Sequence, residues 1–286
     1  MIEIRIENDQ YPDTLRKIKN PPKQLYLEGN IELLNKNSIA IIGSRNCSEN
    51  GKNLAKKFAK ELVEQDLTII SGMAKGIDSH AHIETLNNNG NTIAVLGNGF
   101  NNIFPKENIN LYQKIIKSNG LIISEYPPNV KAKSDFFLER NRIVSGLSIG
   151  ILVIEAAYRS GTSVTARIAK EQGKKIFVLP HEIGDIHGVG TNNLIRKGAT
   201  LVTSTKEIIK EYDFLKYKKI SKKENLKIEF KTIEEKQVYL LLKSKITNIN
   251  IISDKLQLPI NKINEILFML ELHGYIKKKK GVYECI

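Results

Sequence analysis

The sequence predicts an α/β fold: a Rossmann-like, doubly wound, mainly parallel sheet with a small C-terminal winged-helix domain. Two observations predict the sheet. Continuous apolar runs bounded by turn residues recur along the first two thirds of the chain, and amphipathic stretches lie between most of them. Continuous apolar runs suit strands that are covered on both faces. Strands that alternate with helices form a parallel sheet through right-handed crossovers.

Six apolar runs are the expected strands: residues 38–42, 67–70, 92–96, 121–123, 149–154 and 175–179. The amphipathic segments 54–63 and 111–116 are expected helices between them.

With 286 residues, the chain suits one large domain and one small domain. Four parts are expected: an N-terminal approach segment (1–37), the Rossmann-like domain (38–215), a basic linker (216–231) and a winged-helix-like domain (232–286). The linker holds seven lysines and two glutamates with little periodic order, which favours a solvated hinge over a dedicated nucleic-acid contact.

Helical periodicity returns after the linker, over residues 233–242, 251–256 and 263–270, and a short basic hairpin is expected after Gly274. Three helices and a hairpin are typical of a winged helix, whose third helix can enter a DNA major groove. Here that helix carries Lys262 and two glutamates but no arginine. Contact with duplex DNA and contact with a protein are therefore equally expected.

The formal net charge is +13 and the pI is about 9.5, which favours a polyanionic partner. Arginine is scarce, and four of the eight arginines fall at expected loop positions: Arg45, Arg140, Arg142 and Arg159. A guanidinium suits bidentate phosphate contact and base stacking. For any single arginine, a surface ion pair is an equal alternative.

Several classes of protein are excluded. Two cysteines, Cys47 and Cys285, do not indicate a disulfide framework or a zinc site, which fits a reducing cytoplasm. The N-terminus alternates isoleucine with charged residues and is not a signal peptide, and the longest nearly apolar run, 143–154, is too short to span a bilayer. No membrane partner is expected.

Five loops of small or polar residues directly follow the expected strands: Gly43-Ser44-Arg45, Ser71-Gly72, Gly97-Asn98-Gly99, Ser124-Glu125, and Glu155 with Ser160-Gly161-Thr162. Glycine allows a ligand close to the backbone, and a helix that opens from such a turn presents free N–H groups. A doubly wound sheet binds its ligand outside the carboxyl ends of its strands. The loops therefore predict a long groove for a phosphate-bearing chain.

One segment combines stacking rings with phosphate donors, because Phe136 and Phe137 directly precede Arg140, Asn141 and Arg142. Single-stranded nucleic acid is bound by this combination. The alternative is that both rings are core and the arginines cap a helix or pair with Glu139 or Glu155. Taken with the other loops, the binding interpretation is favoured.

No cofactor is predicted. Gly97 and Gly99 begin like a dinucleotide fingerprint, but Asn102 occupies the third glycine position. Gly51-Lys52 resembles the end of a Walker loop, yet the spacing from the preceding glycine is wrong and Asn53 replaces the hydroxyl that holds magnesium.

No metal site and no catalytic set are predicted. His80 and His82 follow an expected N-capping Asp78 and lie on different faces of a helix, so one should face the core. Glu155 can be a buried acid, but it has no second carboxylate or nucleophile at a suitable spacing, and Ser160 has no assigned base.

Seven motifs, read in order, resemble the DNA-processing protein A (DprA, or Smf) family: GSR (43–45), SGMAKGIDSHAH (71–82), TIAVLGNG (92–99), ISEYPP (123–128), FFLERNRIVSGLS (136–148), VIEAAYRSGTSVTARIA (153–169) and GTNNLIRKGA (190–199). The resemblance covers about residues 11–212. It implies a non-enzymatic, cytoplasmic homodimer that binds single-stranded DNA through residues 38–215 and loads the RecA recombinase in natural transformation.

The resemblance also implies which residues meet the DNA. It assigns phosphates to Gly43, Ser44, Arg45, Ser71 and Gly72, bases and phosphates to Phe137, Arg140, Asn141 and Arg142, and further donors to Ser160, Gly161 and Thr162. The sequence departs from the family at Leu138, usually proline, and at His181, usually glycine, and both departures should alter loop shape. The helical N-terminal domain of many members has no counterpart here.

Two rival functions remain open. One is a nucleoside monophosphate phosphoribohydrolase, whose glutamate follows its phosphate loop, whereas Glu155 precedes Gly161-Thr162. The other is a winged-helix regulator that prefers one duplex sequence. Release of a base would support the first, and tighter binding to that duplex than to oligothymidine would support the second.

Overall fold

The computed structural model describes the chain except residues 159, 219–229, 231, 245, 280–281 and 286. It divides into two compact units, residues 1–219 and 220–286.

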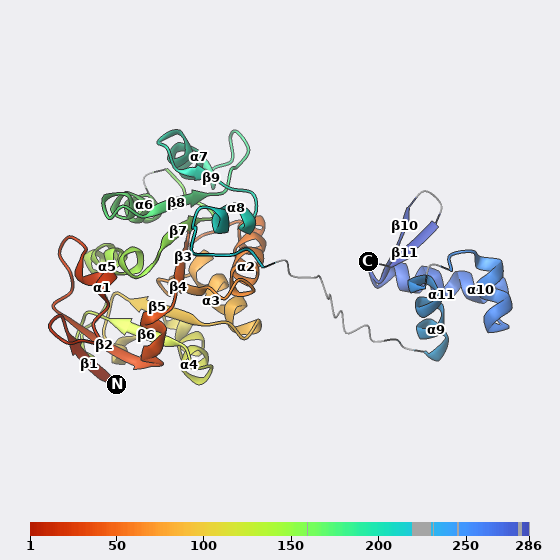
Figure 1. Ribbon diagram of the computed structural model, residues 1–286, viewed down its shortest axis with the longest axis horizontal. Coiled ribbons are helices and arrows are strands. Elements are labelled where there is room, and N and C mark those ends of the chain that lie inside the picture. The colour runs from red at the N-terminus through yellow and green to blue at the C-terminus, as the bar shows by residue number, and fades with distance from the viewer. Residues whose placement is uncertain (159, 219–229, 231, 245, 280–281, 286) are drawn as a thin grey trace. The chain divides into compact units, whose positions relative to one another are not determined.

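The first unit contains a nine-stranded sheet (Figure 1). Its strands, in spatial order, are β1 (Ile2–Arg5), β2 (Gln24–Gly29), β6 (Leu121–Ser124), β5 (Thr92–Leu96), β4 (Thr68–Ser71), β3 (Ser38–Ile42), β7 (Gly150–Val153), β8 (Lys175–Val178) and β9 (Thr200–Leu201). The seven strands from β6 to β9 are parallel, with Ile39 of β3 opposite Ile69 and Gly150. The predicted doubly wound, mainly parallel sheet is confirmed.

Helices cover both faces of the sheet. They are α1 (Asp13–Arg16), α2 (Glu49–Val63), α3 (Ile77–Asn87), α4 (Ile109–Lys117), α5 (Ser134–Leu147), α6 (Gly161–Glu171), α7 (Val189–Arg196) and α8 (Thr205–Lys210), with 3₁₀ turns η1 (Ile31–Asn35), η2 (Phe100–Asn102) and η3 (Lys106–Asn108).

Alternate strand residues divide the core between the two faces. Ile42, Ile70 and Val95 pack with α5 and α6, whereas Ile41 and Ile69 pack with α2 and α3. Each of these strand side chains is at most 6% exposed, which explains why the strands read as continuous apolar runs. Burying a side chain of this size contributes about 1.5–3 kcal/mol to stability.

The N-terminal segment adds two strands to the same sheet. β1 and β2 pair antiparallel, and β2 continues antiparallel onto β6. Tyr11 is buried, and its hydroxyl donates to the carbonyl of Pro22 at 2.7 Å. Leu15 and Ile18 pack against α5 at Gly146. Residues 1–37 therefore complete one edge of the sheet.

The second unit contains α9 (Ile233–Lys243), α10 (Ile249–Leu256) and α11 (Ile260–Leu272), followed by the antiparallel hairpin β10 (Ile276–Lys279) and β11 (Val282–Cys285). Its separate apolar core includes the buried side chains of Val238, Ile263 and Leu270. Three helices and a hairpin are the elements predicted for a winged helix.

Most of the predicted linker lies outside the described residues. Of its described ends, Lys218 belongs to the first unit, where its N–H donates to Gln65 Oε1 at 2.7 Å and its ammonium pairs with Asp66. Phe230 belongs to the second unit, with its ring 5.4 Å from that of Tyr239.

Candidate nucleic-acid interface

The sheet has a topological switch point at β3. After β3 the chain adds β4, β5 and β6 on one side, and then crosses over to add β7, β8 and β9 on the other. The loops that follow β3 and β7 diverge at such a point, which leaves a crevice at the carboxyl ends of the strands. A groove of about 480 Å³ lies there, lined by residues from three of the five predicted loops, those that follow β3, β4 and β7. The predicted loops at Gly97-Asn98-Gly99 and Ser124-Glu125 do not line it, so the groove is shorter than the sequence predicted.

Ten of the twelve predicted site residues line this switch-point groove: Gly43, Ser44, Arg45, Gly72, Phe137, Arg140, Asn141, Ser160, Gly161 and Thr162. The other two do not. Ser71 is fully buried, and its hydroxyl donates to the carbonyl of Ile41 at 2.6 Å. Arg142 points elsewhere on its helix. The sequence therefore predicted the loops of the groove better than the direction of each side chain.

The loop after β3 is braced by the start of α3. Gly76 has a φ of +78°, and a side chain there would meet the carbonyls of Ser44 and Arg45. The Ile77 N–H donates to the carbonyl of Ser44 at 3.2 Å. The exposed guanidinium of Arg45 lies over the ring of Phe137, 5.6 Å from its centroid. The loop thus holds a cation at the groove beside an aromatic face.

The loop after β4 is held by Asp78, which was predicted as the N-cap of α3. That prediction is wrong, because Gly76 is the N-cap and Asp78 lies inside the first turn. Its buried carboxylate accepts from the N–H groups of Gly72 (3.1 Å) and Ala74 (3.4 Å). Burial raises the pKa of Asp78, while nearby Arg140 opposes that rise. Asp78 also lines the groove, so it shapes this loop from the floor of the groove.

The arginines of the aromatic segment lie on α5, so their predicted loop position is wrong. Arg140 is only 3% exposed, and its Nη1 donates to the carbonyl of Val95 at 2.6 Å. Its Nε has no hydrogen-bond partner among the described residues. Burial lowers the pKa of this guanidinium to about 10. Arg140 is a buried cation at the floor of the groove, which an anion there would stabilise.

Arg142 points toward the loop after β6. Its Nη2 donates to both carboxylate oxygens of Glu125, at 2.6 and 2.8 Å, and both side chains are largely buried. The predicted alternative, an ion pair with a nearby glutamate, therefore holds for Arg142, although the partner is Glu125 rather than Glu139 or Glu155. Arg159, the fourth arginine in this set, lies outside the described residues.

The third side of the groove is the start of α6. Ser160 is the N-cap, and its hydroxyl accepts from the Ser163 N–H. Among the described residues, leaving aside its chain neighbours and the backbone of its own helix, no atom lies within 4 Å of where a side chain at Gly161 would be. The N–H groups of a first helical turn have no partner within the helix. This end of the groove therefore presents amide hydrogens and a partial positive charge, which suit an anion.

An aromatic slot of about 140 Å³ adjoins the groove and was not predicted. Phe104, from the loop before α4, lies 5.5 Å from Phe137 of α5 between ring centroids and is 48% exposed. Arg45, Lys75 and Arg140 also line this slot. The sequence offered one signal, an aromatic residue in a polar loop, but only the tertiary fold brings Phe104 to the site. Phe136, unlike Phe137, does not line the groove or the slot; its ring stacks on that of Tyr126, with the two ring centroids 4.1 Å apart.

The histidines occupy separate environments. His82 is fully buried, as predicted for one of the pair, and its Nδ1 lies 2.7 Å from Thr92 Oγ1, whereas His80 is partly exposed. Among the residues that the structure describes, no three histidine, cysteine, aspartate or glutamate side chains cluster as metal ligands, and no helix is long and apolar enough to cross a membrane.

Glu155 is the buried acid that its position predicts. It holds the N-cap residue of α2 by hydrogen bonds and does not line the groove. Its carboxylate accepts from the N–H of Ser48, at 3.0 Å, and from the Ser48 hydroxyl. Ser48 is the N-cap of α2, and its hydroxyl accepts from the Gly51 N–H at 2.9 Å. His187 Nδ1 lies 4.0 Å from the carboxylate. These contacts tie the β7 loop to the helix that follows β3.

The two residues that depart from the family pattern, Leu138 and His181, lie in different environments. Leu138 is 44% exposed and lines the groove. His181 holds its own loop, with Nδ1 2.9 Å from Asp185 and Nε2 donating to the carbonyl of Ile154 at 2.9 Å. Gly188 packs directly against the His181 side chain.

Comparison with known proteins shows the family to which the chain belongs. Residues 3–213 match the family model described as DNA recombination-mediator protein A. The chain belongs to this family. It is 37% identical to Protein Smf of Escherichia coli over 287 residues, which cover 98% of this chain and 76% of that protein. It is 41% identical to the DNA processing protein DprA of Streptococcus pneumoniae over 209 residues, 73% of each chain.

Solved structures from the family share the fold of the first unit. The S. pneumoniae DprA structure matches with a TM-score of 0.71 and 39% identity, over 74% of this chain and 75% of that one. DNA processing protein A of Helicobacter pylori, described for its single-stranded DNA binding mode, matches with a TM-score of 0.66 and 33% identity, over 73% and 94%. The resemblance predicted from the motifs is confirmed, and this chain is a member of a family of DNA-processing recombination mediators.

Proposed function

We propose that this protein binds single-stranded DNA in the switch-point groove, protects incoming DNA and loads the RecA recombinase onto it during natural transformation. One observation carries the proposal. Three backbone loops, a buried unpaired guanidinium edge and an exposed aromatic slot converge on one groove of about 480 Å³. The H. pylori relative, described for binding single-stranded DNA, supports the choice of ligand.

The groove offers separate groups for the two parts of a nucleotide. Phosphates would lie against the loop at Gly43–Arg45 and the amide groups at the start of α6, while Arg140 supplies charge from below. The rings of Phe104 and Phe137 contact each other, so a base would stack on the free face of either ring. Backbone amides and rings do not distinguish bases strongly, so the proposed binding has little sequence preference.

A small-molecule enzyme is the weaker alternative. Glu155 is the carboxylate that a phosphoribohydrolase-like reaction would need, but it does not line the groove and both of its oxygens already accept hydrogen bonds from Ser48. We therefore propose a binding protein without catalysis. A cytoplasmic homodimer that hands DNA to RecA is proposed from family membership.

For the second unit, contact with DNA and contact with a protein are both proposed. On α11, Lys262 pairs with Glu265 at 3.0 Å, so the third helix presents little unpaired charge toward duplex DNA. The hairpin strand β10 carries Lys277, Lys278 and Lys279. A contact with nucleic acid through the hairpin is the version of the DNA proposal that fits these charges.

One titration tests the proposal. The purified chain is titrated with labelled oligothymidine and with a matched duplex at two salt concentrations, with RecA present or absent. The expected result is tighter binding to the single strand, weaker binding at high salt, and faster RecA filament formation on the bound strand. Equal affinity for duplex and single strand, or release of base from a nucleoside monophosphate, would refute it.

A further inference from the structure

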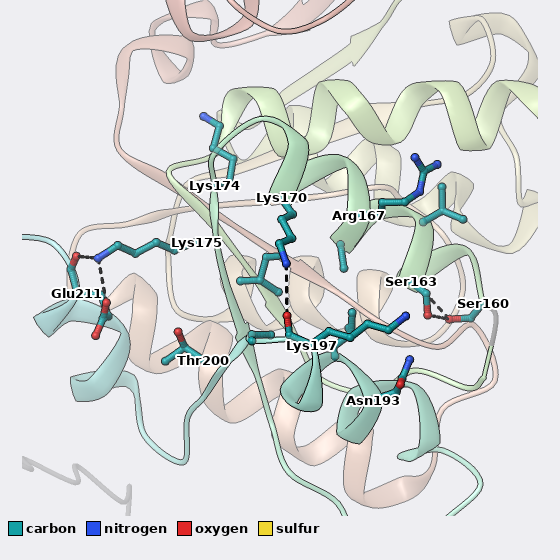
Figure 2. A pocket seen from close by; sticks show the side chains of 16 residues that line it. Ser160, Ser163, Arg167, Lys170, Lys174, Lys175, Asn193, Lys197, Thr200 and Glu211 are labelled. Carbon is teal, nitrogen blue, oxygen red and sulfur yellow. Dashed lines mark hydrogen bonds and ion pairs between the residues drawn. The ribbon is translucent and has the colours of Figure 1, made fainter.

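A second cavity, of about 700 Å³, lies along α6, β8 and the turn after α7 (Figure 2). Five cationic side chains and one carboxylate line it: Arg167, Lys170, Lys174, Lys175, Lys197 and Glu211. Between them the floor is aliphatic, built from Val164, Ile176 and Leu194. We call this cavity the lysine seam.

Most of the positive charge in the lysine seam is uncompensated. Lys175 pairs with Glu211 at 2.9 Å, and Arg167 pairs with Glu171 at 2.7 Å. Lys170, Lys174 and Lys197 have no carboxylate within ion-pair distance in the part of the chain that the structure describes. Lys170 Nζ donates instead to the carbonyl of Lys197 at 3.4 Å, and Lys174 Nζ to that of Gly146 at 3.3 Å.

Partial burial adds a cost at one of these three lysines. Burial lowers the pKa of Lys174, which means that its charged form is poorly solvated where it stands. The Lys170 ammonium lies against the backbone carbonyl of Lys197, whose own side chain extends toward the Ser163 end of the seam (Figure 2). An anion in the seam would compensate the charge that no carboxylate among the described residues neutralises.

The lysine seam begins where the switch-point groove ends. Ser160, the N-cap of α6, lines both cavities. In Figure 2, Ser160 and Ser163 lie at one end of the seam, and Lys175 with Glu211 at the other. Between these ends α6 runs for 11 residues, about 16 Å at the rise of an α-helix. A chain that leaves the groove at Ser160 can therefore continue along the seam.

We propose that the lysine seam binds the phosphate backbone of the single strand as it leaves the switch-point groove. This rests on the proposed function. No aromatic ring lines the seam among the described residues, so bases are not stacked there. Lysine ammonium groups on flexible stems suit phosphates without base selection. The aliphatic floor accommodates the sugars.

A length series tests the seam. Oligothymidine of about six nucleotides fills the groove alone, and oligothymidine of about 15 nucleotides reaches the seam. The variant is Lys170→Ala with Lys197→Ala, and its matched control is Lys114→Ala with Lys117→Ala, two exposed lysines on α4. Affinity is measured over a range of salt concentrations.

The seam variant should bind the short oligomer as the unchanged protein does and lose the gain in affinity for the long one. Its salt slope with the long oligomer should fall by about 1.4, or about 0.7 for each lost phosphate contact. The α4 control should keep both the gain in affinity for the long oligomer and the full salt slope. If the unchanged protein binds the two lengths equally, or if the variant keeps the gain, the seam proposal is wrong while the proposed function stands. Failure of both oligomers to bind would refute the function itself.

Lysine acetylation read by mass spectrometry gives an independent result. The long oligomer should protect Lys170 and Lys197 from acetylation, and the short one should not. Protection by an acidic protein partner in place of the long oligomer would assign the seam to protein binding and overturn the proposal.

Discussion

The guanidinium of Arg140 lies directly against the backbone of Gly72, where it occupies the space that a side chain would need. Arg140 comes from α5 and Gly72 from the loop after β4, so this contact sets the distance between two walls of the switch-point groove. The absence of a side chain at position 72 is what allows a buried arginine to reach the carbonyl of Val95.

Replacing Gly72 with alanine should destabilise the protein, because the added methyl group displaces the Arg140 guanidinium from a closely packed site. Overpacking of this kind costs about 1–3 kcal/mol. Urea unfolding measures the change. Gly161→Ala is the matched control, because nothing lies within 4 Å of its new methyl group, and its change should stay within about 0.5 kcal/mol. Equal effects of the two substitutions would contradict the role of the contact.

Arg45 and Arg142 should differ in DNA binding, although the same motif reasoning assigned both to the strand. Arg45 is exposed at the groove, and Arg45→Ala should lower the salt slope of oligothymidine binding by about 0.7, one phosphate contact. Arg142 is neutralised by Glu125, so Arg142→Ala should lower the slope less.

The main loss in Arg142→Ala should be stability, about 3 kcal/mol, since Glu125 is left largely buried without its partner. Salt-dependent titration and urea unfolding of both variants measure the two effects. A larger slope change in Arg142→Ala than in Arg45→Ala would show that the strand breaks the Glu125 pair and takes Arg142 for itself.

The aromatic slot should contribute stacking energy. Phe137→Ala and Phe104→Ala should each weaken oligothymidine binding by about 1–3 kcal/mol, the range for loss of one stacked base. Phe214→Ala removes a 62% exposed ring outside both cavities and should leave binding unchanged. Quenching of 2-aminopurine placed along the oligomer reports stacking directly. Quenching that survives both slot variants would place the stacked base elsewhere.

The sequence predicted the parallel strands well because each is covered on both faces, and an apolar run such as that of β3 records this directly. It predicted three loops of the groove because the topology of a doubly wound sheet collects them at one edge, but two further predicted loops, at Gly97–Gly99 and Ser124-Glu125, do not line the groove. The sequence did not predict which way the individual side chains of the site point. Arg140 is buried because Val95 and Gly72 receive it, and Phe104 reaches Phe137 only through the fold. No local pattern records these contacts.

Glu155 should matter for stability and not for any hydrolytic activity. Glu155→Gln replaces an acceptor of two hydrogen bonds from Ser48 with an amide that can accept only one of them. A lost bond to a charged group costs about 1.5–3 kcal/mol. Thermal unfolding measures this loss, and chromatography of nucleoside monophosphates measures base release. Release that the unchanged protein catalyses and the variant lacks would instead make Glu155 catalytic.

The pH dependence of stability should carry a signature of His82. The Thr92 hydroxyl donates to the carbonyl of Ile69, so Nδ1 of His82 must donate to Thr92, and Nε2 is left bare and without a partner among the described residues. Burial, with Arg140 nearby, lowers the pKa of His82 to about 3. The unfolded chain binds this proton below about pH 6.5, whereas the folded chain does not.

Stability should therefore fall as the pH drops from about 6.5 toward 3, by about 1.4 kcal/mol per pH unit for this group. Asp78 acts in the opposite direction, because burial raises its pKa and so favours the folded state at low pH. Comparing variants removes that contribution. Between pH 7 and 5, His82→Gln should unfold with a flatter pH dependence than the unchanged protein, whatever its absolute stability. His80→Gln, at a partly exposed position on the same helix, should keep most of the slope. If His82→Gln keeps the full slope, another group takes up the proton.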